Sequence, residues 1–427
     1  MKKKVLLVGP ILTQSGYGEH ARLIYNSLKS REDLFDIYIN PISWGGTSWL
    51  YDDTEQRREI DNLINKTFEH MDQRLPFDLT IMVTIPNEWE KYRASHKSIG
   101  VCAGIESDRV SPHWLDASNR FVDKIIVPSN FSSNVFEKSS WPAKDQHGNE
   151  VDLVLHKQIE SVNYPVEKEF LKPDPSLMSD LELEHDFNFL CVAQWGPRKN
   201  VPNTIKYFLE EFKNENVGLV FKTFSKDNST IDYYHTKKKM DKIISNYPDR
   251  KCSIKLVHGY LSKEEMASLL VHPKIKAMIN FGHGEGFGLP LFEAAATGLP
   301  VITHDWGGQK DFLYAPKKDK KTGKQKLRSH FSKISYDLKE IQAEAVWDSV
   351  LQPESKWAFP HWGSCQIAMR QCYENYDLAK GQATRLKKWV IKEFTKEKIH
   401  AKLVEHFADE EFDIDDWMES LDVEVHD

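Results

Sequence analysis

Two carboxylates, Glu285 and Glu293, flank a run of glycines that could bring backbone close to a ligand. The segment from Gly282 to Gly298 reads GHGEGFGLPLFEAAATG. Glycine has no Cβ atom, so side chains do not block the approach, and one carboxylate can accept hydrogen bonds from two adjacent hydroxyls. Because most of the gap between the carboxylates is loop, both can face one ligand from different sides. This spacing suggests recognition of a sugar by one carboxylate and of a ribose diol by the other.

The elements around this segment predict an anion site. An apolar strand over residues 276–281 precedes the loop, and residues 291–297 form a helical run that ends at Gly298. Pro290 suits the start of a helix, and Glu293 is expected in its first turn. A strand, a glycine loop and a helix N-terminus gather free N–H groups and the positive end of a helix dipole at one point.

A second candidate group is the pair Arg198 and Lys199, which follows an apolar strand predicted over residues 187–194. Arginine offers a planar two-pronged donor and lysine a point charge, and both bind phosphates well. Their place directly after a strand suits a diphosphate. A solvated turn is the alternative interpretation.

These features resemble the E-x7-E motif of the retaining, nucleotide-sugar-dependent glycosyltransferases of the family 4 type, which have the two-domain GT-B fold. The GFGLP sequence between the carboxylates carries the resemblance, and a glycine-rich turn of some other Rossmann-like protein is the alternative. The resemblance implies that Glu285 positions the sugar and steadies an oxocarbenium-like centre, while Glu293 binds ribose. It implies further donor-binding residues in the loop and in an earlier His-Gly-Tyr turn: Gly286, Phe287, Gly288, Leu289 and Tyr260.

The beginning of the chain has a similar pattern. An apolar run over residues 5–9 leads to Gly16, Tyr17 and Gly18, and a helical pattern covers residues 19–28. The resemblance implies that this loop lies under the donor phosphates and the acceptor. Tight glycine turns are also common between strands and helices of any α/β protein.

Glu106 is a further candidate, because it follows a strand predicted over residues 98–103, at the end where α/β ligand sites form. In similar enzymes a histidine or acidic residue near this place lies close to the reacting sugar, but the nearest histidine here, His113, comes several residues later. A helix-start carboxylate is the alternative. The catalytic candidates are Glu285, Lys199, Arg198 and Glu106.

Alternation of apolar strands with helical stretches predicts an α/β protein with parallel sheets. The resemblance implies GT-B: two Rossmann-like domains facing across a cleft, with a C-terminal helix that crosses back to the N-terminal domain. The expected division is an acceptor domain at 1–165, a nucleotide-sugar donor domain at 166–380, the returning helix at 381–408 and an acidic tail at 409–427.

Composition restricts the class of protein. The chain has 427 residues, 40% hydrophobic and 28% charged, with a net charge of −7, which argues against nucleic-acid or membrane binding by the whole surface. Five cysteines without a C-x2-C pair favour reduced thiols and a cytoplasmic location. No apolar stretch approaches the roughly 20 residues of a transmembrane helix. We expect no metal and no cofactor, the nucleotide sugar being the donor substrate.

The acceptor stays open between a glycan, a small molecule and DNA. A lysine-rich run at 314–328 is expected to be a solvated loop, but it could hold a phosphate backbone. Transfer to a hydroxylated DNA base is therefore an alternative function, and a non-catalytic nucleotide-sugar-binding protein is another. An aromatic loop with Trp44 and Trp49 is either a surface loop or an acceptor wall. The donor's base and sugar and the oligomeric state are not predicted.

Overall fold

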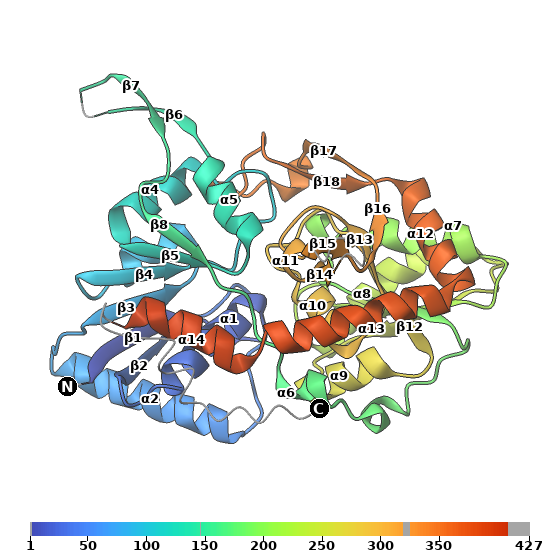
Figure 1. Ribbon diagram of the computed structural model, residues 1–427, viewed down its shortest axis with the longest axis horizontal. Coiled ribbons are helices and arrows are strands. Elements are labelled where there is room, and N and C mark those ends of the chain that lie inside the picture. The colour runs from blue at the N-terminus through green and yellow to red at the C-terminus, as the bar shows by residue number, and fades with distance from the viewer. Residues whose placement is uncertain (1, 146, 319–324, 409–427) are drawn as a thin grey trace. The chain divides into compact units, whose positions relative to one another are not determined.

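The structure is a computed structural model that describes residues 2–145, 147–318 and 325–408. Contacts divide the chain into two compact units (Figure 1). The first unit contains the chain up to Gly104, Arg109–Pro165 and the chain from Phe394 onward, and the second contains Ile105–Asp108 and Val166–Glu393. The predicted acidic tail, 409–427, lies outside the described residues.

The first unit is built on a six-stranded sheet with the order β2-β1-β3-β4-β5-β8, in which all neighbours are parallel. Its strands are β1 Lys3–Gly9, β2 Phe35–Pro41, β3 Leu79–Val83, β4 Lys97–Val101, β5 Lys124–Val127 and β8 Gln158–Ser161. Its helices are α1 Gly16–Lys29, α2 Glu55–Asp72, α3 Trp89–Tyr92, α4 Pro112–Phe121, α5 Asn130–Lys138 and α14 Lys396–Phe407, with a 3-10 turn at Pro86–Glu88. A hairpin of β6 Trp141–Lys144 and β7 Glu150–Leu153 extends from this unit.

The second unit repeats this plan with a parallel sheet of order β11-β10-β9-β12-β13-β16. Its strands are β9 Asn188–Val192, β10 Gly218–Lys222, β11 Ser253–Val257, β12 Ile275–Asn280, β13 Val301–His304 and β16 Ser332–Ile334. Its helices are α6 Lys168–Leu171, α7 Val201–Phe212, α8 Thr230–Ile244, α9 Lys263–Val271, α10 Leu289–Thr297, α11 Lys310–Leu313, α12 Trp362–Glu374 and α13 Tyr376–Glu393. Two hairpins, β14 Tyr314–Lys318 with β15 Gln325–Ser329 and β17 Tyr336–Glu340 with β18 Lys356–Pro360, and 3-10 turns at Pro175–Met178, Pro197–Lys199 and Ala343–Ala345 complete it.

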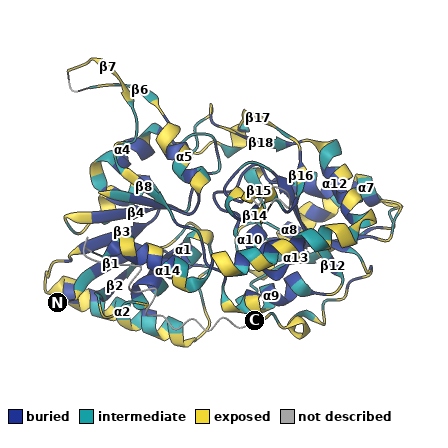
Figure 2. Cartoon of the chain, viewed as in Figure 1, coloured by how far each residue is buried: buried dark blue, intermediate teal, exposed yellow. Residues whose placement is uncertain are grey.

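Hydrophobic burial explains both sheets. The strands are continuous apolar runs because helices cover both faces of a parallel sheet, and Figure 2 shows them buried while the outer faces of the helices are exposed. In the second unit one face of the sheet packs on α7 through fully buried aromatic side chains, among them Phe189, Phe208, Phe212 and Phe221. Parallel strands all end at one edge of their sheet, so the loops that follow them gather there.

Two expectations about the chain's later part differ from the structure. The helical region expected at 381–408 consists of two helices, because Thr395 caps a new helix by accepting a hydrogen bond from the Lys398 N–H. Of these, α13 packs on α10 and α14 packs on α1. The described part of the lysine-rich run is the β14–β15 hairpin rather than a loop. None of the described helices is long and apolar enough to cross a membrane.

Candidate functional site

The glycine loop leads from β12 directly into α10. Gly288, with a φ of 90°, caps the helix in the left-handed conformation, and Gly298, with a φ of 76°, ends it. Both conformations favour glycine. The helix begins at Leu289, earlier than the sequence suggested, so Glu293 lies in the second turn. Its predicted place in the first turn is wrong, because that turn holds no acidic residue.

The Glu285 side chain is at the centre of a charged cluster and is only 8% exposed. Its Oε1 atom accepts hydrogen bonds from Lys199 Nζ at 2.5 Å and from Asn280 Nδ2 at 2.9 Å. Its Oε2 atom is 3.4 Å from Arg198 Nη1. The structure therefore brings together three of the predicted catalytic candidates.

Arg198 connects this cluster to the fourth candidate, Glu106. The guanidinium donates to the Gly284 carbonyl at 2.7 Å and contacts Glu106 Oε1 at 3.2 Å. The backbone of Glu106 also approaches the loop, since a Cβ atom on Gly284 would lie 2.2 Å from the Glu106 carbonyl oxygen. A glycine is required at position 284 for this close approach.

Burial and charge shift the ionisation of these groups in opposite ways. Burial alone would raise the pKa of Glu285, but Lys199 and Arg198 together lower it to about 2. At Lys199, burial lowers the pKa in spite of the attraction of Glu285, with Arg198 adding repulsion. At Arg198, burial is outweighed by Glu106 and Glu285, which raise the pKa. The Glu285 carboxylate is thus held ionised between two cations.

Backbone contacts fix the turn that carries the cations. Asn200 adopts the left-handed conformation with a φ of 52°, which asparagine tolerates better than most residues. Its Nδ2 atom donates to the Phe281 carbonyl at 2.9 Å, and the His283 N–H donates to the Arg198 carbonyl at 2.7 Å. These two hydrogen bonds therefore hold the Arg198–Lys199 turn against Phe281 and His283, at the start of the glycine loop.

A third loop, after β13, supports the glycine loop from the other side. His304 Nε2 contacts the Gly282 carbonyl at 2.8 Å, and the Gly308 N–H donates to the Glu285 carbonyl at 2.8 Å. Gln309 Nε2 donates within the same loop to the Trp306 carbonyl at 2.9 Å. The sequence analysis did not identify the hydrogen bonds from this third loop, nor the hydrogen-bond donors Asn280 and Asn200. The double glycine at 307–308 was the only signal for them.

The remaining donor-loop candidates contribute differently. The Phe287 side chain is 4% exposed, and its ring packs on Phe292 and Phe312 with centroids 5.2 and 5.1 Å apart. Only the backbone of Phe287 can therefore contact a ligand. Glu293 is half-buried on α10, and Tyr260 follows Gly259, whose φ is 93°, in the turn after β11.

The candidates Gly16, Tyr17 and Gly18 lie in the first unit, at the N-terminus of α1. The Gly18 N–H donates to the Ser15 hydroxyl at 3.0 Å. The Tyr17 ring stacks on Trp44 with centroids 4.0 Å apart, which fastens the aromatic loop to the start of the helix. This loop also carries Trp49, which is 45% exposed.

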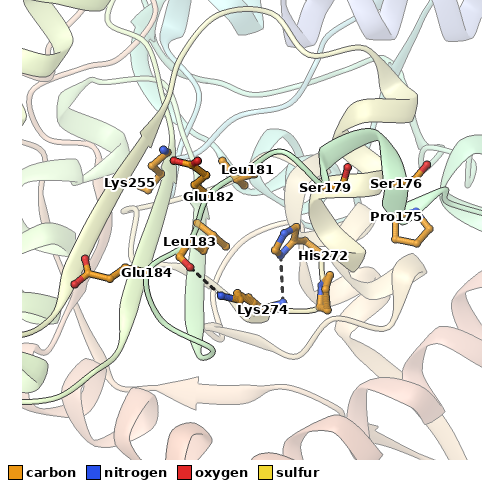
Figure 3. A pocket seen from close by; sticks show the side chains of 11 residues that line it. Pro175, Ser176, Ser179, Leu181, Glu182, Leu183, Glu184, Lys255, His272 and Lys274 are labelled. Carbon is orange, nitrogen blue, oxygen red and sulfur yellow. Dashed lines mark hydrogen bonds between the residues drawn. The ribbon is translucent and has the colours of Figure 1, made fainter.

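A cavity of 840 Å³ in the second unit lies elsewhere (Figure 3). Its wall includes Lys255 of β11 and the turn at His272 and Lys274, which precedes β12. The glycine loop follows the opposite end of β12, so this cavity is not the predicted donor site. Among the described residues, no group of three or more His, Cys, Asp or Glu side chains is arranged to hold a metal ion.

A family of known proteins matches the part of the chain that contains these residues. Residues 178–319, which contain the cation turn and the glycine loop, match the family described as Glycosyl transferases group 1. The matched residues all lie within the second unit. Among curated protein sequences, none matches this chain.

Solved structures establish the architecture of the chain. Sucrose-phosphate synthase from Thermosynechococcus elongatus has a TM-score of 0.63 at 13% identity, covering 95% of this chain and 98% of that one. A glycosyltransferase from Rickettsia africae has a TM-score of 0.60 at 12% identity, with 95% and 98% covered. Anabaena HepE in complex with UDP-glucose has a TM-score of 0.59 at 13% identity, with 95% and 99% covered. The predicted GT-B fold, with two Rossmann-like parallel-sheet domains, is confirmed.

Proposed function

We propose that the protein is a retaining glycosyltransferase of the family 4 type, which moves a sugar from a nucleoside diphosphate sugar to an acceptor hydroxyl without a metal ion. The observation that carries this proposal is the Lys199–Glu285–Arg198 cluster beside the N-terminus of α10. The match of this region to the group 1 glycosyltransferases supports it. HepE, one of the similar structures, was solved with UDP-glucose, so UDP-glucose is the first donor to test.

The charge of the leaving group explains the arrangement. A diphosphate gains negative charge as the glycosidic bond breaks, and one preorganised donor typically contributes about 3 kcal/mol to the transition state. Arg198 and Lys199 supply such donors in this proposal, and the positive end of the α10 helix dipole adds to them. Glu285 both orients Lys199 and balances its charge before the donor arrives.

The same proposal gives the two motif carboxylates different tasks. Glu285 positions the hydroxyls of the transferred sugar, and Glu293 binds the ribose. Glu106 holds Arg198 in the free protein and lies near the reacting groups. The acceptor attacks on the face from which the diphosphate leaves, which retains the anomeric configuration.

Release of nucleoside diphosphate tests the proposal directly. The protein is incubated with UDP-glucose, and with GDP-, ADP- and dTDP-sugars, and the diphosphate released is measured. We expect release from one of them, abolished donor binding in Glu293→Ala, and unchanged turnover in Lys237→Met, whose lysine is an exposed residue of α8. No binding and no release with any donor would contradict the proposal, and an inverted product anomer in NMR spectra would contradict retention.

A basic hairpin favours DNA as an alternative acceptor. In β14 and β15, Lys317 lies directly opposite Lys326, and both are exposed. Like charges in such a cross-strand pair repel each other, and a phosphate backbone would relieve that repulsion. Transfer of labelled sugar to duplex DNA with hydroxylated bases, but not to glycans, would favour this second function.

A further inference from the structure

Lys222 is the last residue of β10 and ends among the loops at the carboxyl edge of the sheet. Its neighbours in the ladder are the ends of β9 and β11: the Ala193 N–H donates to the Lys222 carbonyl at 3.0 Å, and the Thr223 N–H donates to the Val257 carbonyl at 3.1 Å. Strand alternation turns Lys222 away from the face on which Phe221 joins the aromatic core. Lys222 is nevertheless only 8% exposed.

The Lys222 ammonium has an unusual set of partners for a buried charge. It donates a hydrogen bond to the Gly259 carbonyl, and it lies 5.9 Å from the centroid of the Phe224 ring. Within the described ranges no carboxylate forms a salt bridge with it. An ammonium carries three N–H donors, so the Gly259 carbonyl satisfies one of them.

Burying such a group opposes folding. Burial lowers the pKa of Lys222 to about 8, and no neighbouring charge contributes to the shift. An apolar side chain of similar length, such as methionine, would fill the same space without this penalty. A residue that opposes folding at the ligand-binding edge of an α/β sheet is a candidate for a functional role.

The surroundings indicate which part of a donor would meet Lys222. The diphosphate candidates, Arg198 and Lys199, follow β9 on one side, and the turn with Tyr260 follows β11 on the other. A cavity of 420 Å³ is lined by Val257 at the end of β11, by His258 and Gly259 of this turn and by residues of and before α8.

The nearby titratable groups are accounted for. His258 Nε2 and Asp232 Oδ2 form a pair at 2.9 Å, and Asp232 also accepts two backbone N–H groups. Lys239 of α8 donates to the Ser225 hydroxyl at 2.9 Å. These groups hold the loops after β10 and β11.

We propose that Lys222 is a donor-recognition residue, whose ammonium anchors the Gly259 carbonyl and donates its other N–H bonds to an oxygen of the donor's nucleoside. This inference rests on the proposed function, since it assigns a residue to the same donor site. The ligand chemistry is a neutral oxygen acceptor, a base carbonyl or a ribose hydroxyl. Lys222 would thereby discriminate between nucleosides, while the cations after β9 hold the diphosphate.

Calorimetric titration of the full chain tests this inference, with UDP, GDP, ADP, dTDP and inorganic pyrophosphate as probes at pH 7 and pH 9.5. For the diphosphate that binds best to the wild type, Lys222→Met is expected to raise Kd at least tenfold at pH 7. The donor KM should rise in parallel, with kcat changed less than about twofold. Pyrophosphate should bind the variant and the wild type equally.

The pH dependence separates recognition from a structural role. The wild type should lose more affinity than Lys222→Met between pH 7 and pH 9.5, as the Lys222 ammonium loses its proton. A loss that both proteins share belongs to other titrating groups, such as Lys199. Lys222→Arg, which keeps a cation, should recover most of the affinity and should keep it at pH 9.5. If Lys222 had only a structural role, its replacement would change the melting temperature but not the pH dependence of nucleotide affinity.

Each other outcome overturns the inference. Equal nucleotide affinity in a folded Lys222→Met variant would remove the recognition role, and an equal loss of pyrophosphate affinity would assign Lys222 to the phosphates instead. If Lys222→Met fails to fold, the wild type and Lys222→Arg are compared instead. If the affinity of neither protein differs between pH 7 and pH 9.5, the recognition role is again overturned. A wild type that binds none of the diphosphates would overturn the proposed function as well.

Discussion

Two lysines at the same edge of one sheet, Lys199 and Lys222, have different electrostatic surroundings. Lys199 lies 2.5 Å from the Glu285 carboxylate, whose charge balances its own. Lys222 has the Gly259 carbonyl and the face of an aromatic ring, but no carboxylate in a salt bridge among the described residues. The first lysine is part of a preorganised ion cluster, and the second is a buried charge without a balancing one. A cation of the second kind gains most when a ligand brings it an acceptor.

Among variants that test this difference between Lys199 and Lys222, replacement of Glu285 should have the largest effect on activity and stability. Glu285→Gln leaves Lys199 and Arg198 beside each other without their shared counter-charge, and breaking a buried pair typically costs about 3 kcal/mol or more. We expect sugar transfer to fall at least about a thousandfold, near the upper end for one electrostatic group, and the free energy of unfolding to fall by about 3 kcal/mol. Urea unfolding and a transfer assay measure both, with the exposed Glu264→Gln as control. Full activity in Glu285→Gln would show that the ion cluster is not needed for sugar transfer.

Lys199→Met should have the next largest effect. It removes one donor from the proposed diphosphate site, for which a loss of kcat of about a hundredfold is typical. The exposed Lys237→Met serves as the matched control in the same assay. A loss confined to KM would assign Lys199 to ground-state binding only.

This variant should also change the acid stability. The pKa of Glu285 in the folded wild type is about 2, below its ordinary 4.5. Its contribution to stability is therefore complete above pH 4.5 and is lost as the pH falls through about 2. Without Lys199 the folded pKa rises and the contribution shrinks, so Lys199→Met should show a shallower loss of unfolding free energy between pH 4.5 and pH 2. Equal slopes would contradict the pairing.

Lys222→Met should act on stability in the opposite direction. The folded pKa of about 8 lies below the ordinary 10.5, so the folded state binds fewer protons between these values and is penalised at lower pH. The shift corresponds to roughly 3 kcal/mol at most. We expect a gain of about 2 kcal/mol at pH 7, since the Gly259 carbonyl loses its donor. The gain should disappear above pH 10.5 in chemical unfolding curves. If Lys222→Met is less stable than the wild type at pH 7, the buried charge of Lys222 does not oppose folding.

The smallest effect is expected from the turn that accepts the Lys222 hydrogen bond. Gly259 has a φ of 93°, and no atom would contact an added Cβ, so Gly259→Ala tests backbone strain alone. It should cost about 1 kcal/mol and weaken nucleotide binding slightly by displacing the carbonyl. Gly196→Ala, with equally open space but an extended φ of −165°, is the matched control in thermal unfolding. Equal stability of the two variants would exclude strain at Gly259.

Sequence patterns predicted which candidate residues would lie together where short-range signals were strong. The strand, glycine loop and helix around Glu285 and the cation turn at Arg198 are local patterns, and the parallel sheet brings such turns to one edge. Lys222 was not recognised, because its burial depends on which loops cover the end of β10. Asn280 was missed for a related reason, since an amide at a strand end has no distinctive spacing. The lysine-rich run was taken for a loop, because its charges hid the alternation of a hairpin.

The four residues Ile105–Asp108 have a consequence for any attempt to divide this chain. They are flanked on both sides by the first unit, yet they belong to the second, where the Asp108 N–H donates to the Lys356 carbonyl at 2.8 Å. A fragment that starts at Val166 would lack them and would leave Arg198 without Glu106. A fragment starting at Val166 would therefore differ from the second unit of the full chain around Arg198. Affinities measured on that fragment would not apply to the full chain.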